Sequence, residues 1–284
     1  VNERAAQSAP ERKSVSAWCA HGIRPGWLQP DPVKHTKIVE KRKHRTESRV
    51  SLPPKQQLAD LLAAALEGPS PERDNAIVHV LMFGGLRIAE LLGMADDAAE
   101  LRRPGRDGKA GGVLHVVETL CSKHVTLGDV KSDEGYRDVP IGPATAAAVR
   151  EWRVVRGPAS MTQIAGSRVK RRLLARPDTA LREFYSYNDF RRLIWEPLML
   201  RAGLAEVVKT GAHKRVQVEF SAHTLRHAFA SIQIENGVTP KRLQKLLGHA
   251  TLAMTMDLYG HLWTDPEADE AMAEAGERAI VRAN

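Results

Sequence analysis

Residues Ser221 to Leu262 read SAHTLRHAFASIQIENGVTPKRLQKLLGHATLAMTMDLYGHL. Apolar residues recur here at helical spacing, and two glycines, Gly237 and Gly248, stand where helices would stop. Pro240 would occupy the first position of a helix, where its missing N–H costs nothing. The pattern therefore predicts three short helices, over residues 222–236, 240–247 and 251–259.

Four polar side chains of this stretch form a recognisable set. His223 and Arg226 lie on the first predicted helix, His249 follows the second, and Tyr259 ends the third. The order His-x-x-Arg, then Leu-Gly-His, then Tyr resembles the C-terminal motif of the tyrosine recombinases, the phage-type integrases. The resemblance implies an α+β catalytic domain that is predominantly α-helical, with a small antiparallel β-sheet at one edge.

Other interpretations of the stretch stay open. Three helices with polar residues on one face are typical of an ordinary protein core. A helix, a turn and a short basic helix also have the outward form of a helix-turn-helix DNA-binding module. A zinc site at His223 and His227 is not expected. Metalloproteases place Glu after the first His, whereas this chain has Thr224 there, and Arg226 would set a fixed positive charge beside the metal. We therefore expect neither a metal nor a cofactor.

A second arginine motif lies at residues 85–93, GLRIAELLG. The paired glycines would end a helix over residues 74–83, and a new helix would begin near Arg87. Its guanidinium would then lie close to free backbone N–H groups, a favourable place for an anion. An ordinary surface pair of Arg87 with Glu90 is the alternative. The motif also resembles the first-arginine motif of the same family.

Residues 111–141 have β character, with short runs rich in Val and Thr separated by Gly and Asp. They predict the small antiparallel sheet. The turn KSDEG places Lys131 between two of these strands, and the resemblance implies that Lys131 is the catalytic lysine. Lys123, before the second strand, is the second choice.

Further helices are predicted over residues 53–68, 143–155 and 188–202. A polar segment over residues 209–220 would lead back to the first helix of the C-terminal motif. An acidic helix follows Tyr259, and the resemblance implies that residues 265–279 pack against a neighbouring protomer. The inward side chains expected in the helix over residues 188–202 are Phe190, Leu193, Ile194 and Leu198.

Residues 1–50 lack sustained apolar periodicity and are broken by prolines. They predict a linker, or the tail of a missing N-terminal DNA-binding domain, ahead of a catalytic domain over residues 51–284. The chain begins with Val and shows no leader peptide, so we expect a piece of a longer chain. No apolar run has the length of a membrane span. Cys19 and Cys121 lack metal-ligand spacing, and reduced thiols in a cytoplasmic, nucleoid-associated protein are expected.

The sequence of 284 residues carries a formal net charge of +8, which favours a polyanionic partner. Its basic residues cluster in two segments. Each cluster would neutralise several DNA phosphates, or else is a solvated charge run. The candidates for DNA binding are Lys41, Arg42, Lys43, Arg45, Arg168, Lys170, Arg171 and Arg172.

Cleavage of a phosphodiester requires a nucleophile, positive charge at the non-bridging oxygens and a proton for the leaving oxygen. The resemblance implies that Tyr259 attacks phosphorus and forms a 3′-phosphotyrosyl intermediate. Arg87 and Arg226 would bind the phosphate, because a guanidinium is permanently charged and can bind two oxygens at once.

The resemblance implies the remaining roles as well. His223 would take the Tyr proton or orient the phosphate, His249 would donate a hydrogen bond to a non-bridging oxygen, and Lys131 would protonate the departing 5′ oxygen. Rejoining by a 5′ hydroxyl then requires neither metal nor ATP.

The implied function is site-specific recombination of double-stranded DNA, as in the integration or excision of a phage or other mobile element. A homo-oligomer, tetrameric in the synapse, and an accessory DNA-bending protein are the expected partners, and no membrane is expected. A type IB topoisomerase would use similar residues without a defined target. A non-enzymatic helix-turn-helix regulator would need neither Arg87 nor Lys131.

Overall fold

The computed structural model describes residues 52–103, 110–121, 126–130, 135–157, 163–164, 167–168, 172–174, 185–210, 213–263 and 266–281. Residues 1–50, which carry the predicted linker, lie outside this range, and the boundary at residue 51 stays a prediction. Among the described segments, no helix combines the length and apolar character needed to cross a membrane.

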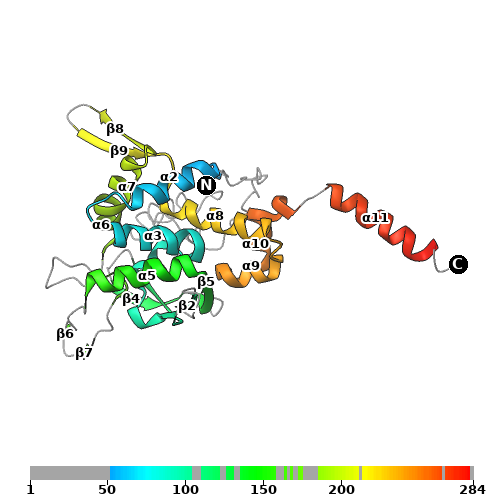
Figure 1. Ribbon diagram of the computed structural model, residues 1–284, viewed down its shortest axis with the longest axis horizontal. Coiled ribbons are helices and arrows are strands. Elements are labelled where there is room, and N and C mark those ends of the chain that lie inside the picture. The colour runs from blue at the N-terminus through cyan, green and yellow to red at the C-terminus, as the bar shows by residue number, and fades with distance from the viewer. Residues whose placement is uncertain are drawn as a thin grey trace, which may run out of the picture. The chain divides into compact units, whose positions relative to one another are not determined.

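Helices make up most of the described fold, as the sequence predicts (Figure 1). α3 packs against the helices on either side of it, α5 and α8, and also against α2. It begins with a proline at its first position, and its buried residues lie on more than one face. The first group of helices is α2 (Lys55–Ala65), α3 (Pro71–Gly84), α4 (Ile88–Gly93) and α5 (Pro143–Arg156).

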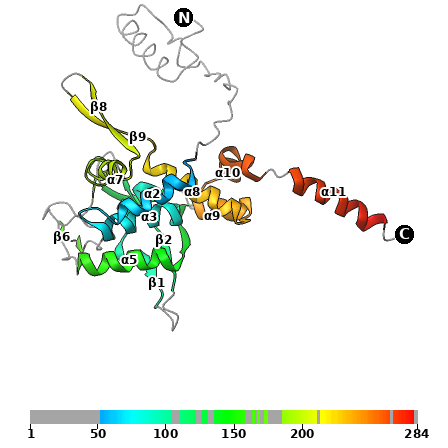
Figure 2. The ribbon, with the colours of Figure 1, turned by 45° about the horizontal axis from the view of Figure 1, so that its top comes forward.

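The predicted C-terminal helices are also present. α8, α9 and α10 follow one another and pack together (Figure 2). Thr239 caps α9 by accepting a hydrogen bond from the backbone N–H of Arg242, and Gly248 ends it in the left-handed conformation. The elements are α8 (Ala222–Glu235), α9 (Pro240–Leu247), α10 (Leu252–Tyr259), the 3₁₀ turn η5 (Gly260–Trp263) and α11 (Pro266–Val281).

The described strands are short and antiparallel, which confirms the predicted β character of residues 111–141. β2 (Gly112–Val116) is the centre of a three-stranded sheet, with β1 (Ala99–Leu101) on one side and β5 (Arg137–Ile141) on the other. β3 (Glu118–Cys121) pairs with β4 (Thr126–Asp129) in a hairpin. The first predicted strand is therefore divided at Val117 between two sheets. β6 (Gln163–Ile164) and β7 (Ser167–Arg168) form a further short pair.

Two elements differ from the sequence expectation. The predicted helix over residues 188–202 consists of α6 (Tyr187–Phe190), a π-helical turn η4 (Arg191–Trp195) and α7 (Glu196–Arg201). The wider turn changes the register, so that Trp195 is buried while Leu193 is 49% exposed. The predicted polar lead-in is instead a hairpin of β8 (Ala205–Thr210) and β9 (His213–Val218).

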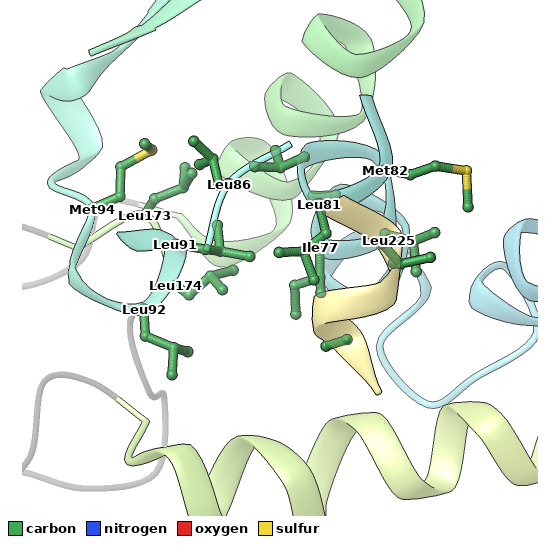
Figure 3. Packing of buried hydrophobic residues seen from close by; sticks show 14 of the residues in the cluster. Ile77, Leu81, Met82, Leu86, Leu91, Leu92, Met94, Leu173, Leu174 and Leu225 are labelled. Carbon is green, nitrogen blue, oxygen red and sulfur yellow. The ribbon is translucent and has the colours of Figure 1, made fainter. Parts of the chain in front are cut away.

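The buried apolar side chains divide into a larger and a smaller cluster. The larger one surrounds α3, and Figure 3 shows Ile77 and Leu81 of α3 near Leu225 of α8. Leu173 and Leu174 join the leucines of α4 in the same cluster. The smaller one lies between α8, α9 and α10 and consists of Phe229, Ala230, Ile234, Leu243, Leu246, Leu247 and Tyr259.

Candidate active site

Arg87 is the N-cap residue of α4, and only Leu86 separates it from the paired glycines that end α3. Gly85 has φ of +60°, a conformation that glycine adopts without strain. The backbone N–H of Arg87 donates to Glu90 Oε2 at 2.7 Å, and its Nη1 donates to Glu90 Oε1 at 2.8 Å. Glu90 therefore fixes both the backbone and the side chain of Arg87.

Arg226 lies on α8 and is only 2% exposed. Its Nη1 donates to the carbonyl of Gly85 at 2.7 Å, and its Nη2 donates to the carbonyl of Leu247. Arg87 Nη2 donates to the next carbonyl, that of Gly248, at 3.2 Å. The two guanidiniums, which come from distant parts of the sequence, thus converge on the C-terminal end of α9.

Burial lowers the pKa of Arg226 to about 9, and the positive charge of Arg87 adds to this effect. Glu90 opposes it by stabilising the charged form. Arg226 therefore remains cationic at neutral pH although water is excluded around it. A desolvated cation of this kind attracts an anion far more strongly than an exposed one does.

Glu90 also binds Arg137, a residue of β5. Arg137 Nη1 and Nη2 donate to the two oxygens of Glu90 at 3.0 and 2.8 Å, and Arg137 Nε donates to the carbonyl of Leu246 at 2.8 Å. Burial alone would raise the pKa of Glu90, but the hydrogen bonds and charge of Arg137, with Arg226 and Arg87, lower it to about 2. The carboxylate of Glu90 thus joins α4 to β5, the strand that follows the KSDEG turn.

The two predicted active-site histidines lie within electrostatic reach of the same arginines. His249 is 5% exposed, and its Nδ1 is 3.0 Å from the hydroxyl of Thr255. This contact directs the opposite edge of the ring, with Nε2, away from Thr255. Burial, together with the positive charges of Arg226 and Arg87, lowers the pKa of His249 to about 4. Burial, Arg226 and Arg87 lower the pKa of His223 in the same way.

Tyr259 ends α10 and is 1% exposed. Its hydroxyl oxygen lies 2.6 Å from Nδ1 of His227. Burial raises the pKa of Tyr259 to about 12, although the charge of Arg226 acts in the opposite direction. The hydroxyl is therefore protonated at neutral pH in this conformation.

A cleft of about 480 Å³ opens beside this group. α9 exposes Lys241, Arg242 and Lys245 on the face opposite its buried leucines, and all three line the cleft together with His249. Tyr136, the residue before β5, also lines the cleft. The positive charge of the site is therefore continuous with an open, basic surface.

The structure brings Arg87, Arg226, His223 and His249 together, with Tyr259 on the adjoining helix. Lys131, Lys123 and the candidates Lys41, Arg42, Lys43, Arg45, Lys170 and Arg171 lie outside the described residues. Arg168 is described only as part of β7.

Arg172 requires a correction. It is 3% exposed, and its Nη1 donates to the carbonyl of Gly93 at 2.8 Å and forms an ion pair with Glu118. A guanidinium held inside the fold by these partners is not free to bind DNA. Arg172 instead connects its segment to the end of α4.

Sequence reasoning missed two residues of this site. His227 was considered only as a possible metal ligand. Among the described residues, no group of three or more His, Cys, Asp or Glu side chains could hold a metal ion. Arg137 had a usable signal, because it shares the inward face of β5 with Val139 and Ile141. An arginine at a buried strand position needs an anionic partner, and that requirement points to a carboxylate.

Comparison with known proteins identifies the family of this chain. The model of the phage integrase family matches residues 122–264. A tyrosine recombinase XerC from Mycobacterium sp. (strain KMS) is 30% identical over 260 residues, which cover 89% of this chain and 71% of the relative. The chain belongs to the phage integrase family.

Some other members of the family match over less of their own length. A tyrosine recombinase XerC from Pelobacter propionicus is 29% identical over 216 residues, 72% of this chain and 55% of the relative. The chain spans about half the length of this protein and of other curated relatives. Among solved structures, the Tn1549 transposon integrase in complex with transposon right end DNA has a TM-score of 0.61 at 20% identity, over 95% of this chain and 78% of the integrase. This likeness confirms the fold class of a tyrosine recombinase catalytic domain.

Proposed function

We propose that this integrase-family chain cleaves and rejoins double-stranded DNA through a phosphotyrosyl intermediate at Tyr259, in a site-specific recombination reaction. One observation carries the proposal. Arg87 and Arg226 reach the adjacent carbonyls of Gly248 and Leu247, which places two guanidiniums beside His249 and one helix away from Tyr259.

This arrangement meets the electrostatic requirement of phosphodiester cleavage. The charge that develops on the non-bridging oxygens would be stabilised by Arg87 and Arg226, with a hydrogen bond from Nε2 of His249. Donors that are fixed in advance and shielded from water stabilise such charge without reorganisation. Removal of one such donor costs about 3 to 4 kcal/mol of transition-state stabilisation in comparable sites. The reaction would therefore proceed without a metal and without ATP.

The leaving 5′ oxygen needs a proton, and we assign this role to Lys131, with Lys123 as the alternative. Support comes from the position of Arg137, which follows the KSDEG turn and is held by Glu90 at the site. Because Glu90 binds both Arg137 and Arg87, it links the start of β5 to Arg87. A lysine on the preceding turn would then approach the phosphate from the β5 side.

DNA is the proposed partner, and the Tn1549 integrase supplies a relative in complex with DNA. We propose that Lys241, Arg242 and Lys245 contact phosphates from the cleft, in addition to the basic candidates at Lys41, Arg42, Lys43, Arg45, Arg168, Lys170 and Arg171. Assembly as a homo-oligomer on DNA, tetrameric in the synapse, is part of the proposal. So are an accessory DNA-bending protein, a phage or mobile-element origin and a cytoplasmic, nucleoid-associated location.

The test is incubation of the chain with nicked duplex suicide substrates in EDTA, followed by denaturing electrophoresis. We expect a covalent protein–DNA adduct that the Tyr259→Phe variant does not form. Tyr187→Phe is the matched control, because Tyr187 is exposed on α6, far along the chain from the motif. Failure of wild type to form the adduct, or adduct formation by Tyr259→Phe, would count against the proposal.

Two rival functions give different results in the same assay. A topoisomerase would cleave unrelated duplexes at similar rates and relax supercoiled DNA. A non-enzymatic regulator would bind DNA equally well with and without the Tyr259 hydroxyl and would form no adduct.

A further inference from the structure

The hydroxyl of Tyr259 is bound by a side chain outside the family motif. His227 lies on α8, one residue after Arg226, and its Nδ1 is 2.6 Å from the hydroxyl oxygen. The rings of His227 and Tyr259 have centroids 5.8 Å apart. His223 contacts His227 edge to face, with ring centroids 4.9 Å apart. Of the two histidines on this helix, His227 is therefore the one that holds the nucleophilic oxygen.

The hydroxyl cannot act as a strong nucleophile until its proton is removed. Burial raises the pKa of Tyr259 to about 12, well above physiological pH. A phenol in this state needs a base within hydrogen-bonding distance, about 2.6 to 3.2 Å. Nδ1 of His227 meets this geometric requirement.

The positive charges near His227 suit a base that becomes effective only when DNA is bound. Burial lowers the pKa of His227 to about 4, and His223 and Arg226 contribute to this effect. At neutral pH the imidazole is therefore neutral and retains a lone pair. A phosphate bound between Arg87 and Arg226 would offset part of their positive charge, which would raise the pKa of His227 and favour proton transfer.

We propose that His227 is a further catalytic residue, which accepts the proton of Tyr259 as the tyrosine attacks DNA. In this step the Oη–H bond breaks and the proton passes to Nδ1. Oη bonds to phosphorus, and the bond from phosphorus to the 5′ oxygen breaks. The 5′ oxygen takes a proton from the general acid. In rejoining, the 5′ hydroxyl returns its proton to the deprotonated general acid as its oxygen bonds to phosphorus. The bond from phosphorus to Oη breaks, and His227 returns its proton to Oη.

This inference rests on the proposed function, since it takes Tyr259 as the nucleophile. It differs from the role that the family resemblance implies for His223. His223 contacts the ring of His227 and lies within electrostatic reach of Arg226 and Arg87. That position suits contact with the phosphate better than contact with the phenol.

The experiment measures the single-turnover rate of adduct formation on nicked suicide duplexes as a function of pH. The variant is His227→Asn, because the Asn side-chain oxygen takes the place of Nδ1 and accepts a hydrogen bond but not a proton. We expect the rate to fall about 100-fold or more and to lose the inflection that His227 gives to the wild-type pH profile. Fluorotyrosine at position 259, a more acidic phenol, should restore much of the rate in His227→Asn and change that of wild type little.

A second measurement does not depend on activity. Nitrogen NMR of His227 in the full chain should find the neutral ring protonated at Nε2, with Nδ1 as acceptor. A proton on Nδ1 would overturn the proposal, whatever the cleavage assay gives. So would a His227→Asn variant that cleaves as fast as wild type or faster, or one whose slow rate keeps the wild-type pH profile. Loss of the adduct in wild type concerns Tyr259 itself and contradicts the proposed function instead.

Discussion

Glu90 is a single carboxylate that serves two arginines, and this has a consequence for stability. Its folded-state pKa of about 2 lies below the ordinary value of 4.5, because the cations outweigh the effect of burial. A lowered pKa means that Glu90 stabilises the fold above pH 4.5 and that this contribution is lost as the pH falls towards 2. The shift corresponds to about 3 kcal/mol.

We therefore predict that the free energy of unfolding, measured by denaturant titration, falls by about 3 kcal/mol between pH 4.5 and pH 2 because of Glu90 alone. The Glu90→Gln variant should be less stable than wild type at pH 7, and the difference should shrink as the pH falls. A difference that stays constant over this range would contradict the assigned role.

The spacing of single residues predicted much of the site. Arg87 and Arg226 were predicted from two short motifs, and the structure brings them to the adjacent carbonyls of Gly248 and Leu247. His227 was missed because a sequence shows no distance between a histidine on one helix and a tyrosine at the end of another, 32 residues along the chain. The prediction that Arg172 binds DNA was wrong for a related reason. A run of basic residues does not reveal which of them turns inward to meet Glu118.

At the scale of elements, the turn between α3 and α4 holds the site against α8. Gly85 has φ of +60°, and its carbonyl accepts from Arg226. A Cβ at this position would lie 2.3 Å from Cδ1 of Phe229. We predict that Gly85→Ala lowers the free energy of unfolding by about 2 to 5 kcal/mol, from backbone strain and overpacking together.

Gly237 supplies the matched control for this prediction. Its φ is also positive, at +76°, but an added Cβ would meet nothing within 4 Å. Gly237→Ala should therefore show the backbone cost alone, about 1 kcal/mol. Chemical denaturation of the two variants side by side measures the difference. Equal losses would mean that contact with Phe229 does not matter.

Elements with strong local signals were predicted well, and those that depend on distant partners were not. α9 has a capping threonine, a proline at its first position and a terminal glycine, all visible in the sequence. The hairpin of β8 and β9 has a mixed polar pattern without clear alternation, and its strands are defined by their pairing with each other. The helical spacing of residues 188–202 did not predict the π turn η4, which buries Trp195 and leaves Leu193 exposed.

At the scale of the whole molecule, we propose that α11 contributes to assembly rather than to the stability of the fold. Its described side chains, residues 270–278, are all exposed, and Met272 is 69% exposed. We predict that removal of residues 266–281 changes the free energy of unfolding by no more than about 0.5 kcal/mol, as expected for exposed residues, but weakens assembly on DNA. Sedimentation of protein–DNA complexes measures the second effect.

A point variant distinguishes the effect of the helix as a whole from the effect of its apolar side chain at Met272. Met272→Glu retains α11 in full and replaces an exposed apolar side chain with a charged one. Reduced assembly with unchanged stability is the expected result. Wild-type assembly in both variants would show that α11 makes no contact between protomers.

The separation of the buried side chains into two clusters has a mechanical consequence. α8 belongs to both, since Leu225 and Ala228 pack in the larger cluster while Phe229 and Ala230 pack in the smaller. The charged groups on α8 are therefore anchored in the main body. α10 and η5 depend on the smaller cluster alone, and a region with few buried contacts opens locally at a lower free energy than the whole domain unfolds. In the proposed reaction, incoming DNA would displace α10 and η5 at small cost, while the pocket formed by Arg87 and Arg226 would keep its shape.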